Sequence, residues 1–193
     1  AGEETRQIGN ELEKLHIYLG ERRTVELEDV RLLVPLSRKG VVFEISRALE
    51  RRDAERAIEL VDAQLEKGEN AIGLIRAAII PTVRNLFMVR VLMDAHPGLP
   101  TASGPGFTAA LNRLPEGERA WLPRTKTGKV NGWGLFFAAR KASQFTTSEM
   151  REAMESALQA DKSLVTTALD PRMVLHRLVA ELCMGAKKRR KSA

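Results

Sequence analysis

The residues of this sequence best suited to chemistry are two tryptophans and a set of basic side chains between Arg113 and Lys141. Indole rings stack on unpaired nucleic-acid bases, and Lys and Arg side chains follow the phosphate backbone. Only Glu116 and Glu118 oppose the basic residues in this stretch. The pattern predicts a DNA contact, but tryptophans in a long connection also pin a loop to a helical body. The candidate contact residues are Arg113, Arg119, Trp121, Arg124, Lys126, Lys129, Trp133, Arg140 and Lys141.

A second basic cluster lies near the end of the sequence, at Lys187, Lys188, Arg189, Arg190 and Lys191. It carries most of the formal net charge of +6, so the rest of the chain is nearly neutral. Such a cluster attracts phosphates, but it also occurs as a solvated, frayed end. We expect residues 186–193 to form a basic disordered tail, and both roles stay open.

Two glycine-containing stretches resemble nucleotide-binding motifs and fail in detail. The segment TKTGKV resembles the end of a P-loop, but Pro123 stands where the first glycine is required, and Val130 replaces the Ser or Thr that binds magnesium. Gly104, Gly106 and Ala109 satisfy G-x-G-x-x-A, but no strand precedes them. We therefore interpret both as loop glycines.

Catalytic and metal-binding groupings are also missing from the sequence pattern. His16, His96 and His176 have no partner at metal-ligand spacing, and Cys183 is the single cysteine. No Ser, His and Asp grouping indicates a nucleophile. We expect no catalytic residue, no metal site, no cofactor-binding residue and no cofactor.

The elements that must position the basic stretch are helices. Strand-like alternation is nearly absent, and aromatic residues make up only 5% of the sequence. Thr146 and Glu149 form a capping-box pattern, and Asp170 precedes Pro171 as an N-cap. Gly185 is expected to end the second of these helices. The fold class is therefore predicted to be all-α, a helical bundle preceded by a short helical hairpin.

Each of these two helices carries an apolar face at helical spacing, and we expect both faces to be buried. The first face consists of Met150, Ala153, Met154, Ala157 and Leu158. The second consists of Val174, Leu175, Leu178, Val179 and Leu182.

The upstream part predicts a helical hairpin and a central helix. Ile8, Leu12, Leu15 and Leu19 share the face of a first helix that ends at Gly20. A second helix is expected to start near Glu28 and to end at Pro35, with a linker from Pro35 to Gly40. The sequence from Ala71 to about Ala95 is apolar on much of its circumference and is placed at the centre of the bundle, with a kink at Pro81.

The loops and the cellular setting follow from composition. Residues 96–106 are predicted to be a loop, followed by a short helix near residues 107–114 and a connection without regular structure up to Leu135. We find no apolar run of membrane-spanning length and no signal peptide, and the single cysteine fits a reducing compartment. We expect a cytoplasmic, bacterial protein without membrane contact. Because the sequence lacks an initiating Met and opens close to a helix, we expect a fragment of a longer protein.

Three segments in this order resemble the delta subunit of the bacterial DNA polymerase III clamp loader: residues 9–30, 42–90 and 145–179. The resemblance rests on the Glu-Lys-Leu helix before a glycine, on Phe43 and Glu44, and on the run Leu-Asp-Pro-Arg at residues 169–172. It implies that residues 1–36 are the end of a helical lid and that residues 41–185 are a C-terminal collar.

The resemblance also implies a function without intrinsic enzymatic activity. Through its collar, the chain would join the other clamp-loader subunits into the ring that opens the sliding clamp and loads it on primed DNA. The sliding clamp would be contacted only through an N-terminal module that this sequence lacks, and the parent holoenzyme is a DNA-directed DNA polymerase, a nucleotidyltransferase. The alternative is a free-standing helical nucleic-acid-binding protein. A third hypothesis, an unrecognised enzyme, has no support from any residue grouping.

Overall fold

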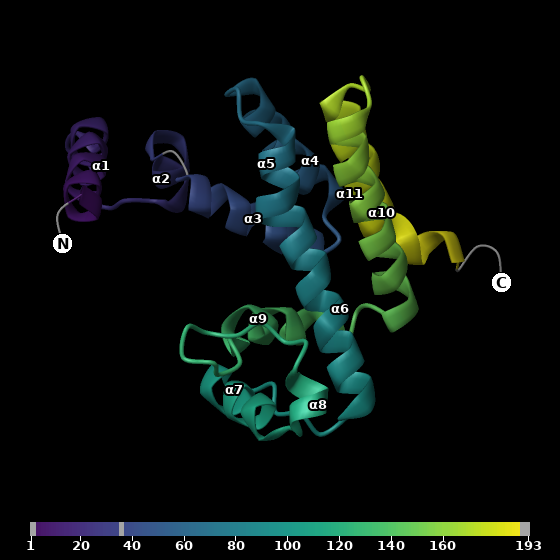
Figure 1. The fold of residues 1–193 in the computed structure, drawn as a ribbon. Coiled ribbons are helices and arrows are strands. Elements are labelled where there is room, and N and C mark those ends of the chain that lie inside the picture. The colour runs from purple at the N-terminus through teal and green to yellow at the C-terminus, as the bar shows by residue number, and fades with distance from the viewer. Residues whose placement is uncertain (1–2, 35–36, 190–193) are drawn as a thin grey trace. The chain divides into compact units, whose positions relative to one another are not determined.

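The computed structural model describes residues 3–34 and 37–189, and helices dominate it (Figure 1). Within these residues the chain forms no named strand, and Arg124 and Val130 make an isolated antiparallel bridge. The all-α fold class predicted from the sequence is confirmed. The chain divides into two compact units, Ala1–Val41 and Val42–Ala193. Whether these units correspond to a lid and a collar stays a prediction.

The expected linker is shorter than the sequence predicted. Helix α3 (Arg38–Glu50) already includes the residues from Arg38 to Gly40, so the prediction of a linker up to Gly40 was wrong. The side chain of Ser37 accepts a hydrogen bond from the backbone N of Gly40 at 3.1 Å, which satisfies one of the free N–H groups of the first helical turn. Residues 35 and 36 lie outside the described residues.

The first unit is a hairpin of α1 (Glu3–Leu19) and α2 (Leu27–Leu33). Gly20, with φ +57°, follows α1, as the sequence predicted. The carboxylate of Asp29 accepts hydrogen bonds from the backbone N of Glu26 (2.9 Å) and from Nη2 of Arg22 (2.8 Å). The bond from Arg22 lowers the pKa of Asp29 below its ordinary value. These bonds fix the turn between the two helices.

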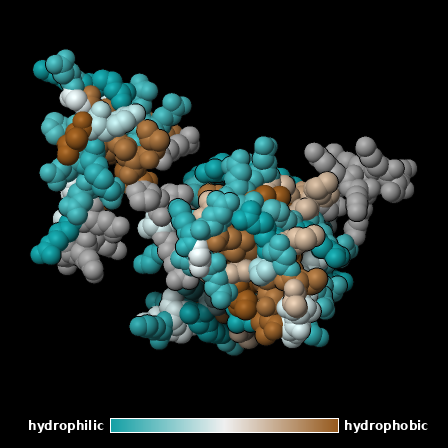
Figure 2. Space-filling view, turned by 90° about the horizontal axis from the view of Figure 1, so that it is seen from above, coloured by the Kyte–Doolittle hydropathy of each residue, from teal (hydrophilic) through white to brown (hydrophobic). Residues whose placement is uncertain are grey.

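This hairpin leaves much of its apolar surface uncovered. Leu15 is buried, but Ile8 and Leu12 on the same predicted face are 60% and 61% exposed. Two short helices have too little surface to enclose a full apolar stripe. Further exposed apolar side chains of this unit are Ile17, Tyr18, Val25, Leu27 and Leu32. Apolar surface is visible among hydrophilic surface in Figure 2.

The central helix of the second unit runs through α5 (Ala71–Leu74), a π-helical turn (Ile75–Ile79) and α6 (Ile80–Ala95). The backbone N of Ile80 donates to the carbonyl of Ile75, five residues back, immediately before Pro81. The hydroxyl of Thr82 donates to the carbonyl of Ala78 (2.7 Å). The disturbance expected at Pro81 therefore takes the form of a π-helical turn. The central position is confirmed, since α6 packs against α9 (Gly132–Ala142) and α10 (Thr147–Thr166).

The same helix is longer and more apolar than we expected from the sequence. Ala71–Ala95 is long and apolar enough, by length and composition, to cross a membrane, so the statement that no apolar run reaches that length was wrong. Of the most apolar 18-residue window of this helix, 44% is buried inside the protein. Its contacts with α9 and α10 are those of a core helix.

The two helices with clear end signals form as predicted at their starts. The backbone N of Glu149 donates to Oγ1 of Thr146 (3.2 Å), and the backbone N of Thr146 donates to the Glu149 carboxylate (3.3 Å), which begins α10. The backbone N of Arg172 donates to the carboxylate of Asp170 (2.9 Å), which begins α11 (Pro171–Arg189). Both predicted caps are confirmed.

Two predictions for these helices were wrong. Leu158 is 64% exposed because it lies on the outer face of α10, away from the buried Ala153 and Ala157. Gly185 does not end α11, which continues to Arg189. A glycine inside a helix costs about 1 kcal/mol relative to alanine, which a packed helix tolerates. Helix α11 includes residues 186–189 of the predicted tail, and residues 190–193 lie outside the described residues.

The core of the second unit sits where α6, α10, α11 and α4 (Ala54–Glu66) meet. Helix α10 packs against α6 and α11, and α11 packs against α4. Nε2 of His176 lies 2.7 Å from Oδ1 of Asp62, which joins α11 to α4 at the edge of this core. The fully buried side chains of α11 are Leu175, Leu178 and Val179.

Candidate nucleic-acid interface

The basic stretch lies on three helices and one hairpin-like turn at one end of the second unit (Figure 1). Helix α7 (Gly104–Arg113) begins inside the stretch predicted to be a loop, and α9 begins at Gly132, before the predicted start near Leu135. The short α8 (Glu116–Arg119) lies between them. Both loop predictions were therefore too long. Helix α7 begins early because Ser103 caps it, accepting a hydrogen bond from the backbone N of Gly106 (3.3 Å).

Helices α7 and α9 pack closely, and a glycine allows this approach. A Cβ atom at Gly132 would lie 2.3 Å from Oγ1 of Thr108, a distance that no real contact allows. The first turn of α9 therefore sits directly on α7. This contact fixes the position of the aromatic residues that follow Gly132.

The segment resembling a P-loop is a tight surface turn. The backbone N of Thr125 donates to the carbonyl of Lys129 (2.8 Å), and the backbone N of Gly128 donates to the carbonyl of Thr125 (3.0 Å). Gly128 has φ +78°, a conformation that favours glycine. Val130 is buried. The turn displays Lys126 and Lys129 to solvent, and its glycine serves the turn.

Asn112 holds this turn against α7. Its side-chain oxygen accepts a hydrogen bond from the backbone N of Val130 (3.0 Å), and its Nδ2 donates to the carbonyl of Thr108 (2.8 Å). Its backbone carbonyl accepts a hydrogen bond from Nη1 of Arg119 (2.6 Å). The sequence reasoning missed Asn112, because a lone Asn in a helical segment carries no signal of a partner 18 residues away.

Two of the nine predicted contact residues, Arg119 and Arg124, use their side chains in hydrogen bonds within the protein. Nε of Arg119 donates to Glu116 (2.8 Å), and Arg124 donates to the other carboxylate oxygen of Glu116 and to the carbonyl of Gly128 (3.0 Å). The bond from Arg124, followed by that from Arg119, lowers the pKa of Glu116. Both guanidinium groups thus share one carboxylate and bind the turn to α8.

Four other predicted residues present their charges to solvent. Arg113, Lys126, Lys129 and Arg140 are exposed, and their side chains make no hydrogen bond or ion pair within residues 3–34 and 37–189. Lys141 is half-buried near Glu50. Burial raises the pKa of the Glu50 carboxyl, while the charge of Lys141 acts in the opposite direction.

The two tryptophans lie in different surroundings. Trp133 is 57% exposed, and its ring meets Phe136 edge-on at 6.3 Å between centroids and Phe137 at 6.2 Å. It also covers Gly104, where a Cβ atom would lie 3.0 Å from the indole. Trp121 is 41% exposed, and no ring contact in the described part of the chain includes it. Part of each indole is therefore accessible to solvent.

The arrangement offers partly exposed aromatic rings together with unpaired cations, which are the groups that bind single-stranded nucleic acid. No described ring contact joins Trp121 to Trp133. The DNA contact stays a prediction. Metal ligation has no support here, since His, Cys, Asp and Glu form no group of three suited to a metal ion among the residues that the structure describes.

Comparison with known proteins gives one solved structure of similar fold. No family model matches the chain, and no curated protein matches it. The DNA clamp loader delta protein of Bacillus subtilis (YqeN) superposes with a TM-score of 0.54 and 18% sequence identity. The match covers 90% of this chain and 44% of that protein, so the chain spans less than half the length of its structural neighbour. The chain thus has a helical fold similar to that of part of a clamp loader delta protein.

Proposed function

We propose that this chain is a non-catalytic part of a DNA polymerase III clamp loader, equivalent to the lid end and the collar of its delta subunit. The single observation that carries the proposal is the fold similarity to a clamp loader delta protein over 90% of the chain. The order of the motifs at residues 9–30, 42–90 and 145–179 supports it independently of the fold.

In this proposal the second unit is a rigid assembly module. Its helices are cross-linked by polar contacts between distant residues, which suits a scaffold that must hold its shape. Arg76 on the central helix makes two hydrogen bonds to the carboxylate of Asp161 on α10, at 2.7 and 3.0 Å. The module joins the other clamp-loader subunits in the bacterial cytoplasm.

The chemistry of the loader then lies outside this chain. In this proposal, ATP hydrolysis, contact with the sliding clamp and nucleotidyl transfer belong to other parts of the holoenzyme. Primed DNA meets this chain in the assembled complex.

A second candidate function is nucleic-acid binding by the chain alone. The observation that favours it is the presence of four exposed cations without partners among the described residues, beside the partly exposed Trp121 and Trp133. Nucleic-acid binding of this kind needs no partner subunit. The two functions are compatible if the assembled loader uses the same surface on DNA.

The proposal is tested by co-expression of the tagged chain with the other clamp-loader subunits of the organism that encodes it. We expect these subunits to co-purify with the chain through a high-salt wash, because a stable subunit interface is largely apolar. A tagged helical protein of similar charge is the control. Recovery of the subunits with the control alone or with neither protein contradicts the proposal.

A further inference from the structure

Backbone carbonyls hold the guanidinium groups of Arg119 and Arg124 in place. Nη1 of Arg119 donates to the carbonyl of Asn112 (2.6 Å), near the end of α7. Nη1 of Arg124 donates to the carbonyl of Gly128 (3.0 Å) in the surface turn. A carbonyl is a neutral acceptor, so these bonds orient both groups without removing their positive charge.

Other donors of the same two groups converge on one carboxylate. Nε of Arg119 donates to Oε2 of Glu116 (2.8 Å), and Nη2 of Arg124 donates to Oε1. Two anchored guanidinium groups directed at one pair of oxygens also suit a phosphate group, because guanidinium donors match carboxylate and phosphate alike. We call Arg119 and Arg124 the arginine fork. Glu116 lies in it where a phosphate would fit.

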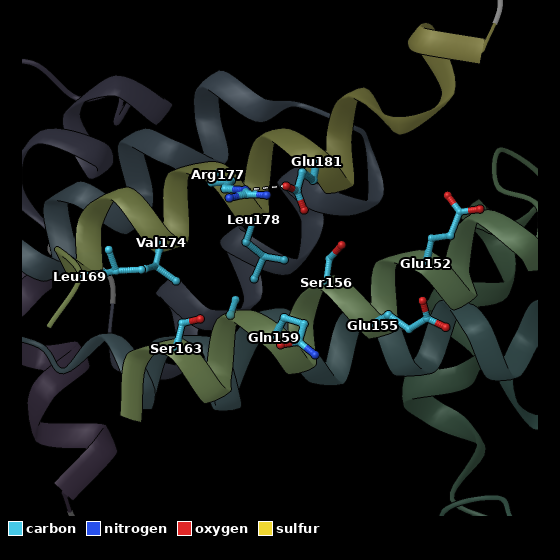
Figure 3. Close-up of a pocket in the computed structure, with 11 residues that line it drawn as sticks. Glu152, Glu155, Ser156, Gln159, Ser163, Leu169, Val174, Arg177, Leu178 and Glu181 are labelled. Carbon is cyan, nitrogen blue, oxygen red and sulfur yellow. Dashed lines mark hydrogen bonds and ion pairs between the residues drawn. The ribbon is translucent and has the colours of Figure 1, made fainter. Parts of the chain in front are cut away.

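An ordinary surface ion pair of this chain lacks such anchoring. In the pocket between α10 and α11, Nε of Arg177 donates to Oε1 of Glu181 at 2.8 Å (Figure 3). The Arg177 side chain is 83% exposed and makes no further hydrogen bond or ion pair in the described part of the chain. Arg177 is therefore oriented by its carboxylate alone, whereas the arginine fork keeps its carbonyl bonds when the carboxylate leaves.

Exposed cations without partners among the described residues lie next to the fork in the chain. Arg113 directly follows Asn112, and Lys129 directly follows Gly128, the two residues whose carbonyls hold the arginines. Lys126 belongs to the same turn. Several cations beside one phosphate-sized site match the repeated charges of a nucleic-acid backbone better than a single free anion.

We propose that the arginine fork binds a backbone phosphate of a single nucleic-acid strand, and that Glu116 fills this site when no strand is bound. The Glu116 side chain is 62% exposed, and no residue of α8 is buried. It therefore rotates into solvent without disturbing the core, and the phosphate takes its place. This inference deepens the second candidate function and rests on it.

Glu116 then acts as a built-in competitor of the strand. In the wild type, the phosphate replaces one ionic contact of the fork with another, so the two arginines add little to the affinity. Neutral glutamine at this position removes the competing charge, and both arginines become available to phosphate. The inference therefore predicts that loss of a carboxylate strengthens binding, and that this gain depends on the fork.

The chain offers a closely matched control for this test. Glu116→Gln keeps the size of the side chain and removes its charge. Glu118→Gln removes the same charge two residues further along α8, where Oε2 of Glu118 lies 2.6 Å from Nε2 of His96. Arg119→Gln, made in the wild type and in Glu116→Gln, removes one arm of the fork. Arg124→Gln, in the same two backgrounds, removes the other. Each variant is checked for an unchanged circular dichroism spectrum.

The probe is fluorescein-labelled oligothymidylate, measured by anisotropy with the full chain at several salt concentrations. We expect Glu116→Gln to bind about tenfold more tightly than the wild type, as a gained charged hydrogen bond does. Its salt slope should steepen by about 0.7 for each added phosphate contact. Glu118→Gln should stay within about threefold of the wild type, which is the effect of net charge alone.

The arginine variants measure the coupling to Glu116. Arg119→Gln and Arg124→Gln should each weaken binding about tenfold in the Glu116→Gln background but only about twofold in the wild type, because residues in one network are not additive. Inorganic phosphate at matched ionic strength should not displace the oligonucleotide. Displacement by inorganic phosphate would assign the fork to a free anion and overturn the nucleic-acid assignment.

Two further results separate this inference from the function on which it rests. If oligothymidylate binds, but Glu116→Gln is no tighter than Glu118→Gln or the arginine variants cost the same in both backgrounds, the masked fork is refuted and nucleic-acid binding stands. If neither the wild type nor Glu116→Gln binds at low salt, both are refuted. Co-purification with the loader subunits is measured separately, so the clamp-loader proposal is untouched in either case.

Discussion

Nη2 of Arg52 lies 2.6 Å from Oε1 of Glu149, and this ion pair joins the turn after α3 to the first turn of α10. The two side chains are 17% and 15% exposed. The same guanidinium donates to the carbonyl of Gln144 (3.0 Å) and lies 4.1 Å above the ring of Phe145. Arg52 also has φ +57°, in the left-handed region that favours glycine. Its contacts offset this local strain.

Substitution of Arg52 separates the contacts from the strain. Arg52→Ala removes the contacts, leaves Glu149 without its ion-pair partner and keeps the unfavourable φ, so we expect a loss of about 2 to 3 kcal/mol in the free energy of unfolding. Arg52→Gly loses the same contacts but relieves the strain, so it should be more stable than Arg52→Ala by about 1 kcal/mol. Urea unfolding measures both, with Arg51→Ala as the control. Equal losses for all three variants contradict this account.

Leu178 supports the core between α10 and α11. Its side chain is 2% exposed, so Leu178→Asp would bury a charge without a partner. We expect this variant to be unfolded or destabilised by more than about 3 kcal/mol. Leu158→Asp, on the exposed face of α10, should change the stability by less than about 0.5 kcal/mol. Thermal unfolding compares the two, and an unchanged melting curve for Leu178→Asp would refute the assignment of this core.

The sequence predicted local features of the fold well. Helix starts at Thr146 and Asp170 were visible because the capping partners lie two or three residues away in the chain. The burial of Leu175, Leu178 and Val179 followed from helical spacing, since one face of the last helix had to meet the core.

Features that depend on distant contacts could not be predicted. The exposure of Leu158 depends on which neighbours cover α10, and helical spacing alone does not give that direction. The continuation of α11 past Gly185 shows that a glycine ends a helix only where the backbone turns left-handed. In the candidate site, Arg119 and Arg124 were predicted to contact DNA, but both bind Glu116. The pairing of Arg119 follows from i,i+3 spacing, whereas that of Arg124 depends on how the turn folds back on α8.

Cys183 gives a pH dependence of stability. Burial raises the pKa of its thiol from 9.0 to about 11. Between these values the unfolded chain releases the proton and the folded chain keeps it, so the free energy of unfolding falls as the pH rises through this window. We expect Cys183→Ala to lose less melting temperature than the wild type between pH 8 and about pH 10.5.

Thiol labelling provides the second measurement on Cys183. A thiol reagent at pH 8 should react with the chain only when it is unfolded in guanidinium, because the folded thiol is both protonated and buried. Rapid labelling of the native chain, or identical pH profiles of wild type and Cys183→Ala, would contradict the assigned environment.

The basic stretch predicts weak, salt-sensitive DNA binding. We expect single-stranded DNA to bind the chain at low salt through the exposed cations, with an affinity that falls steeply as salt rises. If the indoles stack on bases, each contributes about 1 to 3 kcal/mol, so the double variant Trp121→Ala, Trp133→Ala should lose affinity and keep most of the salt dependence. Fluorescence anisotropy at two salt concentrations measures both quantities.

Two controls assign this binding to the right surface. A version ending at Gly185 removes the basic end of the chain, and Lys126→Gln, Lys129→Gln neutralises the turn without touching the ring contacts of Trp133. We expect the turn variant to reduce the salt slope. Binding that depends only on the truncated end, or absence of binding at low salt, would rule out a DNA contact between Arg113 and Lys141.

Light scattering after size exclusion tests directly whether the chain assembles with other loader subunits. The purified, untagged chain is mixed with the purified loader subunits of its own organism, and the masses with and without the chain are compared. We expect a complex heavier than the subunits alone by at least one copy of the chain, stable at about 0.5 M salt because an apolar interface is little screened. Elution of the chain at its own mass, with the subunit complex unchanged, would contradict its assembly into the loader.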